Sequence, residues 1–385
     1  MQDSPDTTAV TAGRDESGAL APTLWPTTVW QTEGLDDTSR RATGVRQDGL
    51  YSRYSNPTVR QFEDGIAALE GAESALAFAS GMGAIASVVL ALCGRGSHIV
   101  AQNNLYGATL SFLRGPCARF GIDVTFVDPA DAGAFAAAVQ PGRTMLVIAE
   151  SPSNPRLALT DLSALSAING PFTIVDSTMA TPLGQRPLDF GVDLVLHSAT
   201  KGIGGHNDAL LGVVAGAAEL LDEIWAYSVM HGAVASPHDA LNALRGLRTL
   251  AVRTERQHTT ALRLGHALAS HPRVTSTIHP FLESHPQHAL ARAQMRMGGT
   301  LLALEIDGGT QACRDVISRL RLARPATSFG GPETLVCHPL SSTHAGLSPD
   351  DLAAMKVTEG LLRVSVGLEN ADDLLADFTS ALAGG

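Results

Sequence analysis

Three groups of chemically capable side chains follow predicted strands in this sequence. The turn Ser80-Gly81-Met82-Gly83 leads from an apolar run into a helical pattern, so its unpaired backbone N–H groups could hold a phosphate. Asp176 ends a second apolar run, and Ser198-Ala199-Thr200-Lys201 follows a third. Ligands of open α/β sheets bind beyond the carboxyl ends of the strands, so we expect these groups to share one site.

Asp176 and Lys201 together point to a cofactor. A carboxylate in such a place is costly unless it meets a cation or hydrogen-bond donors, and a protonated pyridine nitrogen would serve. A lysine amine can form an imine with an aldehyde and later act as a base. With the phosphate-binding turn, the two residues predict pyridoxal 5'-phosphate, held by Lys201 as a Schiff base and by Asp176 at its ring nitrogen. Taken singly, Asp176 also fits a helix N-cap, and Ser198 and Thr200 also fit turn capping.

The scarcity of lysine gives Lys201 further weight. Of the 27 basic residues only two are lysines, Lys201 and Lys356. Arginine replaces lysine on most solvated surfaces but does not deprotonate to form an imine. Lys356 lies on a probable helix, where a surface charge explains it.

Two competing motifs are weaker. Residues 81–86 satisfy the G-x-G-x-x-A fingerprint of nicotinamide-dependent dehydrogenases, but the next strand ends in 101–104, Ala-Gln-Asn-Asn, without the acidic residue that holds the ribose. Ser80 lacks the G-x-S-x-G frame of a nucleophile-elbow hydrolase. The cofactor interpretation therefore accounts for more of the residues.

The elements that would position these groups alternate in type. From Ser74 onward short apolar runs alternate with helical patterns, and several runs are continuous, as in strands buried on both faces. The pattern predicts an α/β protein with a mostly parallel sheet flanked by helices. Helices are expected near 81–92, after Gly107 and near 132–139.

Three parts of the chain differ in the periodicity of their apolar and polar residues. Residues 1–55 are polar and weakly periodic, which predicts an extended N-terminal arm that contacts a neighbouring subunit. Residues 56–240 form the predicted large domain. Residues 241–385 begin with long helical segments and then mix strands with helices, which predicts a smaller α+β C-terminal domain.

Composition excludes several function classes. A formal charge of −11 argues against a nucleic-acid or anionic-membrane surface, so a small-molecule partner is expected. The sequence shows neither a leader pattern nor an apolar run of membrane-spanning length, which predicts a cytoplasmic protein without membrane contact. The four cysteines are widely spaced without a C-x-x-C pair, which favours reduced thiols and predicts no metal site.

With these residues in place, the sequence resembles the cysteine and methionine metabolism family of pyridoxal-phosphate enzymes, the group of cystathionine γ-lyase, cystathionine γ-synthase, methionine γ-lyase and O-acylhomoserine sulfhydrylase. The resemblance runs along nearly the whole chain and implies fold type I, the aspartate aminotransferase-like fold. It is carried in order by YSRYSNPT (51–58), LEGAESALAFASGMGAI (69–85), LYGAT (105–109), ESPSNP (150–155), IVDSTMATP (174–182), HSATKGIGGHND (197–208), SPHDALNALRGLRTL (236–250), SFGGPETL (328–335) and LLRVSVGLE (361–369).

The resemblance implies roles for matching residues. Lys201 and Asp176 keep the roles argued above, and Tyr106 would stack on the ring and shuttle protons. The remaining expected cofactor contacts are the phosphate cradle Gly81, Met82, Ser198 and Thr200, the amide of Asn154 near the ring hydroxyl, and Tyr51 with Arg53 from a neighbouring subunit. The expected substrate contacts are Arg363 and Ser328 at the carboxylate, together with Asn154 and Glu333.

The implied activity is γ-elimination from a sulfur amino acid, L-cystathionine or L-methionine, to 2-oxobutyrate, ammonia and a thiol. The implied assembly is a homotetramer, a dimer of dimers with active sites shared across the dimer interface. A γ-synthase or an O-acylhomoserine sulfhydrylase uses the same residues and stays an alternative. A noncatalytic protein that binds pyridoxal phosphate is the alternative from a different class.

Some positions depart from the family pattern and bear on the substrate. Gly202 and Met179 stand where larger or aromatic residues are usual, and Ser177 where asparagine is common, which suggests a looser pocket. Ala108 stands where methionine γ-lyases often carry cysteine, which weakens that subtype. Glu333 lies where cystathionine-handling members usually have glutamate, and its charge could meet the distal ammonium of cystathionine.

Overall fold

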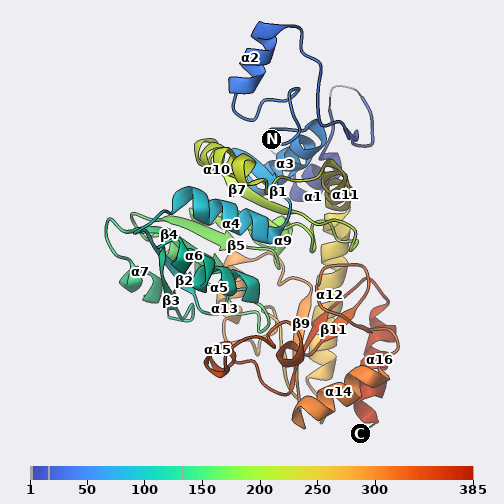
Figure 1. Ribbon diagram of the computed structural model, residues 1–385. Helices are drawn as coiled ribbons and strands as arrows, with labels where there is room; N and C mark the ends of the chain where they lie inside the picture. The colour runs from blue at the N-terminus through green and yellow to red at the C-terminus, as the bar shows by residue number, and fades with distance from the viewer. Residues whose placement is uncertain (1–2, 16–17, 132, 385) are drawn as a thin grey trace.

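A seven-stranded sheet forms the centre of the computed structural model, which describes residues 3–15, 18–131 and 133–384 (Figure 1). Its strand order is β1-β7-β6-β5-β4-β2-β3. The strands from β6 to β3 are parallel, whereas β7 is antiparallel to both of its neighbours. The strands are β1 (Ser74–Phe78), β2 (His98–Gln102), β3 (Asp123–Val127), β4 (Thr144–Glu150), β5 (Phe172–Asp176), β6 (Leu194–Ser198) and β7 (Gly212–Gly216).

The central strands are apolar because both faces of the sheet are covered. In β6, Leu194 and Leu196 join the core on one face, whereas Val195 joins the core on the other. Helices α4 and α10 contribute to the first core, and α3 and α11 to the second. The predicted α/β class with a mostly parallel sheet is confirmed. The helices of this part are α3 (Pro57–Glu70), α4 (Gly81–Leu92), α5 (Gly107–Arg114), α6 (Pro116–Arg119), α7 (Ala134–Ala138), α8 (Leu162–Ser166), α9 (Thr181–Gly184), α10 (Ala218–His231) and α11 (Pro237–Leu247).

The N-terminal segment is less extended than its composition indicates. Helix α1 (Pro5–Thr11) starts with Ser4, whose side chain accepts from the Thr7 N–H, and it buries Ala9 against the second core. Helix α2 (Leu35–Thr43) stands away from the body (Figure 1). Its acidic residues in the first turn and arginines in the last turn interact favourably with the helix dipole. These charges favour a helix here although the segment has few apolar residues. The described part of the segment therefore contains helices α1 and α2, and the extended arm over residues 1–55 that contacts a neighbouring subunit stays a prediction.

A second sheet lies in the C-terminal third and has a core of its own. Its order is β10-β11-β12-β9-β8, with β12 antiparallel to both β11 and β9. The strong strand signals at 301–306 and 361–365 are confirmed, whereas the division of the chain at 55/56 and 240/241 stays a prediction. The elements here are α12 (Leu250–Leu268), β8 (Val274–Ile278), α13 (His288–Gln294), β9 (Leu301–Ile306), α14 (Gly309–Arg319), β10 (Arg324–Pro325), β11 (Leu335–Cys337), α15 (Pro349–Ala354), β12 (Leu361–Ser365) and α16 (Ala371–Ala383).

The expected helix near 132–139 is observed as α7, Ala134–Ala138, and position 132 lies outside the described residues. The helix expected at 81–92 is observed with those bounds. In the described ranges, no helix has both the length and the apolar character needed to cross a bilayer.

Candidate active site

A cavity of about 460 Å³ opens at the carboxyl ends of the parallel strands, a size typical of small-molecule sites. It collects residues from both sheets, because Arg363 of β12 and the segment 327–329 face the strand ends of the large sheet. Ten of the residues singled out from the sequence line it: Gly81, Met82, Tyr106, Asn154, Asp176, Ser198, Thr200, Lys201, Ser328 and Arg363.

The start of α4 forms one end of the cavity, where the sequence predicts a phosphate site. Ser80 caps this helix, and its Oγ accepts from the Gly83 N–H at 3.0 Å. A Cβ on Gly81 would lie 2.9 Å from the Cβ of Ser198, so only glycine permits this approach of helix and strand end. The first turn of α4 leaves its N–H groups without intrahelical acceptors, which makes it an anion site.

Asp176 lies at the end of β5 and is part-exposed to the cavity. Thr178 donates both its N–H, at 3.0 Å, and its hydroxyl to Oδ1 of Asp176. In the part of the chain that the structure describes, no hydrogen bond is formed by Oδ2, which can therefore receive a donor from a ligand. Burial raises the pKa of Asp176, while the bonds from Thr178 lower it. A cation on the cavity side would offset the cost of burial.

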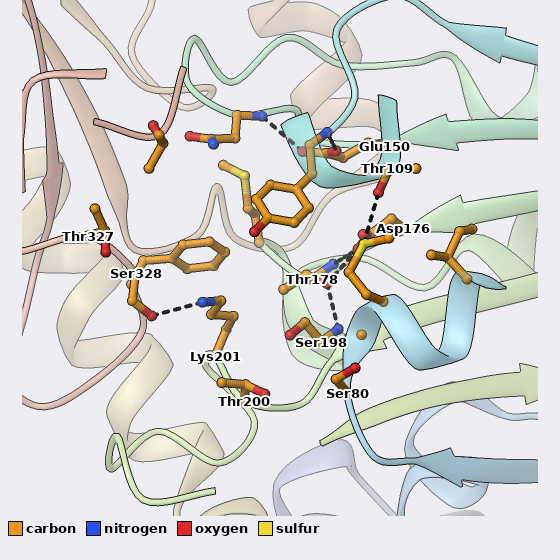
Figure 2. A pocket seen from close by; sticks show the side chains of 18 of the residues that line it. Ser80, Thr109, Glu150, Asp176, Thr178, Ser198, Thr200, Lys201, Thr327 and Ser328 are labelled. Carbon is orange, nitrogen blue, oxygen red and sulfur yellow. Dashed lines mark hydrogen bonds between the residues drawn. The ribbon is translucent and has the colours of Figure 1, made fainter. Parts of the chain in front are cut away.

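Lys201 enters the cavity opposite this carboxylate. Its Nζ donates to Ser328 Oγ at 2.9 Å, and Figure 2 shows the two side chains pointing toward each other. Burial lowers the pKa of the Lys201 amine, and the positive charge of Arg363 lowers it further. A larger fraction of the amine is therefore in the nucleophilic, unprotonated form.

Arg363 is 3% exposed and is held by two hydrogen bonds. Its Nη1 donates to Asn154 Oδ1 at 3.1 Å, and its Nη2 donates to the Ser328 carbonyl at 2.8 Å. Nε is buried and has no partner among the described residues. A fixed guanidinium with unused donor capacity beside a buried amine suits the carboxylate of an amino acid.

Tyr106 caps the N-terminus of α5 and is 46% exposed, with its ring at the cavity wall. Its backbone N–H donates to Glu150, a buried residue that also lines the cavity. Glu150, Thr178 and Phe329 were missed in the sequence. Glu150 ends β4 as Asp176 ends β5, so the rule about strand ends would have found it.

Three of the predicted residues lie outside the cavity of a single chain. Tyr51 is 40% exposed in the N-terminal segment, and Arg53 stacks on its ring and donates to the Val229 carbonyl at 2.7 Å. Glu333 is exposed and accepts from Asn207 Nδ2 at 3.0 Å. Among the described residues, no group of three or more His, Cys, Asp or Glu side chains is placed to hold a metal ion.

This geometry has close counterparts among known proteins. Residues 6–383 match the model of the Cys/Met metabolism PLP-dependent enzyme family. The chain is 41% identical over 374 residues to L-methionine gamma-lyase of Pseudomonas putida, covering 96% of this chain and 94% of that protein. It is 40% identical over 383 residues to O-succinylhomoserine sulfhydrylase of Pseudomonas aeruginosa, covering 98% and 95%.

A solved structure of cystathionine gamma synthase from Xanthomonas oryzae pv. oryzae in complex with cystathionine matches with a TM-score of 0.93 and 34% identity. The match covers 100% of this chain and 98% of that one. The protein therefore belongs to the Cys/Met metabolism family of PLP-dependent enzymes, and its fold is PLP fold type I.

Pyridoxal phosphate is the cofactor of this family, and the cavity fits it. The first turn of α4 against Ser198 offers N–H groups for the phosphate, and Asp176 has a free oxygen for a ring N–H. Lys201 would supply an amine with lowered pKa for the aldehyde carbon. These are three separate features of one cavity, and bound pyridoxal phosphate would use all of them.

Proposed function

We propose that this enzyme is a carbon–sulfur lyase that eliminates the γ-substituent of L-methionine or a related thioether amino acid, releasing 2-oxobutyrate, ammonia and a thiol. The observation that carries the proposal is the charge pattern of the cavity. Its ionisable lining residues are Tyr106, Glu150, Asp176, Lys201 and Arg363. All except Glu150 have a proposed use in holding the cofactor, binding the amino-acid part of the substrate or moving protons, and both oxygens of Glu150 already accept hydrogen bonds from backbone N–H groups. Apart from the amide of Asn154, the rest of the wall is apolar or hydroxylic.

The charges of the cavity lining favour methionine over cystathionine as the substrate. The side chain of cystathionine ends in an ammonium and a second carboxylate, whereas that of methionine ends in an uncharged thioether. Apolar residues, including Met179, Leu210 and Phe329, suit the uncharged group. Glu333 was expected to meet the distal ammonium, but it faces solvent and bonds Asn207. The relatives named L-methionine gamma-lyase support the same preference.

The proposed roles follow from the contacts. Arg363 binds the substrate carboxylate, and Asn154 and Ser328 hold the guanidinium in place. Lys201, whose amine has a lowered pKa, takes the proton from the α-carbon, and a second proton leaves the β-carbon before the γ-substituent departs. The Tyr106 hydroxyl gives a proton to the departing sulfur. Bound pyridoxal phosphate supplies the electron sink that makes these carbon–hydrogen bonds acidic.

A second copy of the chain completes the proposed site. The segment that carries Tyr51 and Arg53 follows the projecting helix α2 (Figure 1), and neither residue lines the cavity of its own chain. We infer that these two side chains reach the phosphate end of the neighbouring subunit, within a homotetramer built from two such dimers. The cytoplasm is the proposed location, since all four cysteines are free and buried, as in reducing compartments.

The activity is tested with purified protein and pyridoxal phosphate. L-methionine, L-cystathionine, and O-succinylhomoserine with cysteine are supplied separately, and 2-oxobutyrate, thiol and cystathionine are measured. We expect 2-oxobutyrate and methanethiol from methionine in excess of any turnover of cystathionine. Cystathionine formed from the ester would move the assignment to a γ-synthase, and no product in any reaction, despite bound cofactor, would refute catalysis.

Sharing of sites is tested by subunit complementation. Arg53→Ala and Lys201→Ala each disable their own contribution to a site. When the two variants are denatured together and refolded, a mixed dimer has one site with an intact Lys201 and an intact Arg53. Recovery of about a quarter of the activity supports sharing, since half of the dimers are mixed and each has one competent site of two. Absence of recovery contradicts it.

A further inference from the structure

Glu150 is a buried carboxylate that the proposed chemistry leaves without a role. It ends β4, is 6% exposed, and lies in register beside Asp176 of β5. A second carboxylate next to the one for the ring nitrogen is expensive, because like charges in a buried place repel. Other groups must therefore stabilise the Glu150 carboxylate in this buried position. Burial, followed by the charge of Asp176, raises the pKa of Glu150, whereas the hydrogen bonds from the Asn154 and Tyr106 N–H groups lower it and favour the ionised carboxylate.

Two backbone N–H groups stabilise the Glu150 carboxylate by donating hydrogen bonds to it. Oε2 of Glu150 accepts from the Tyr106 N–H at 2.6 Å, and Oε1 accepts from the Asn154 N–H at 3.0 Å. The Glu150 side chain therefore forms hydrogen bonds to the backbone of two loops, the loop from β2 to α5 and the loop after β4. Both donors belong to residues that line the cavity.

The surrounding polar network strengthens the same connection. Gln102 at the end of β2 bonds the backbone of Glu150 in both directions: its Oε1 accepts from the Glu150 N–H at 2.9 Å, and its Nε2 donates to the Glu150 carbonyl at 3.1 Å. Asn104 Nδ2 donates to Ser153 Oγ at 3.0 Å, which ties one loop directly to the other. The two loops are held as one unit with Glu150 at its centre.

We propose that Glu150 is a positioning residue of this active site, whose carboxylate sets the Tyr106 ring and the Asn154 amide over the cofactor by holding both of their backbone N–H groups. The proposal rests on the proposed roles of Tyr106 and Asn154. Both oxygens of a carboxylate accept hydrogen bonds, whereas a glutamine amide offers one acceptor and one donor group. Glu150→Gln keeps size and shape but leaves one of the two N–H groups facing a donor.

The test compares Glu150→Gln with Glu283→Gln, which makes the same chemical change at an exposed position. Four kinds of measurement are made: the melting temperature without cofactor, the dissociation constant for pyridoxal phosphate, the visible circular dichroism of the bound cofactor, and the steady-state kinetics that give kcat and KM. The dichroism depends on how groups such as Tyr106 lie against the ring, and it is read without turnover. A protein inactive on every thioether would therefore still test this inference.

For Glu150→Gln we expect altered dichroism and a kcat lower by about 10- to 100-fold with KM within threefold, the loss that one charge-assisted hydrogen bond represents. Glu283→Gln should match the parent in all four. A lower melting temperature with unchanged dichroism and unchanged kcat would mean that Glu150 only stabilises the fold, and would overturn the proposal.

A second variant decides the matter if Glu150→Gln does not fold. Asn104→Ala combined with Ser153→Ala removes the direct tie between the loops and leaves the buried carboxylate intact. We expect a smaller change of the dichroism in the same direction and a decrease of kcat of about threefold. Dichroism and kcat equal to those of the parent would show that the position of the two loops does not matter, and would overturn the proposal independently.

Discussion

Replacing Arg363 with lysine tests the proposed carboxylate clamp most directly. The change keeps the positive charge in a site that is almost fully buried but removes the planar fork. The shorter ammonium cannot hold both the Asn154 Oδ1 and the Ser328 carbonyl, which now accept from separate nitrogens of the guanidinium. Substrate orientation should therefore suffer while cofactor binding is kept.

The magnitude follows from the hydrogen bonds lost. A bidentate contact to a carboxylate becomes a single contact, and one charge-assisted bond contributes about 1.5–3 kcal/mol. At about 1.4 kcal/mol for each factor of ten, kcat/KM for L-methionine should fall by about 10- to 150-fold, mainly through KM. The dissociation constant for pyridoxal phosphate should stay within threefold. Arg119→Lys, at an exposed position on α6, should change neither quantity.

The assay measures 2-oxobutyrate release over a range of methionine concentrations, with 3-(methylthio)propylamine as a competing ligand that lacks the carboxylate. The parent protein should strongly prefer methionine over this amine, and Arg363→Lys should lose most of that preference. If KM changes by less than threefold, or if the preference survives, the carboxylate binds elsewhere and the assignment of Arg363 is refuted.

Three further changes test other parts of the site and the fold. Gly81→Ala places a Cβ 2.9 Å from that of Ser198, an overlap that costs about 1–3 kcal/mol, so the dissociation constant for pyridoxal phosphate should rise roughly tenfold in an absorbance titration. Thr178→Ala removes a donor that lowers the pKa of Asp176, so cofactor binding should weaken by about tenfold at pH 6 and by less at pH 8.5; equal weakening at both would contradict this. Burial, followed by the charge of neighbouring histidines, lowers the pKa of His279 from 6.5 to about 3, so the neutral ring contributes stability that is full above pH 6.5 and is lost as the pH falls toward 3. Between pH 7 and 5 the parent should therefore lose about 2 kcal/mol more than His279→Gln in urea unfolding, and parallel pH dependences would refute the assignment.

Residue types at the ends of predicted strands were sufficient to indicate the cofactor. Asp176 and Lys201 could be paired from their places in the chain, because each follows a short continuous apolar run typical of a buried strand, and parallel strands bring their carboxyl ends to one edge of the sheet. The helix at 81–92 was equally clear, since Ser80 caps it and Gly81 precedes an apolar run. Helix α2 was missed because it has no buried residue and is too poor in apolar residues to show an apolar stripe.

Short stretches of the sequence alone determine which reactive groups the site has: a predicted phosphate-binding turn, a carboxylate and an amine, each at the end of a predicted strand. Tertiary packing determines which distant groups meet them. Arg363 lies 162 positions after Lys201, yet the second sheet brings it close enough to lower the pKa of that amine. Glu333 resembles a substrate contact by position, but the fold turns it toward Asn207 and solvent. The proposed positioning role of Glu150 depends on its hydrogen bonds to two N–H groups from separate loops, which the sequence does not show. Contacts between segments far apart in the chain depend on packing and loop paths, which local propensity does not encode.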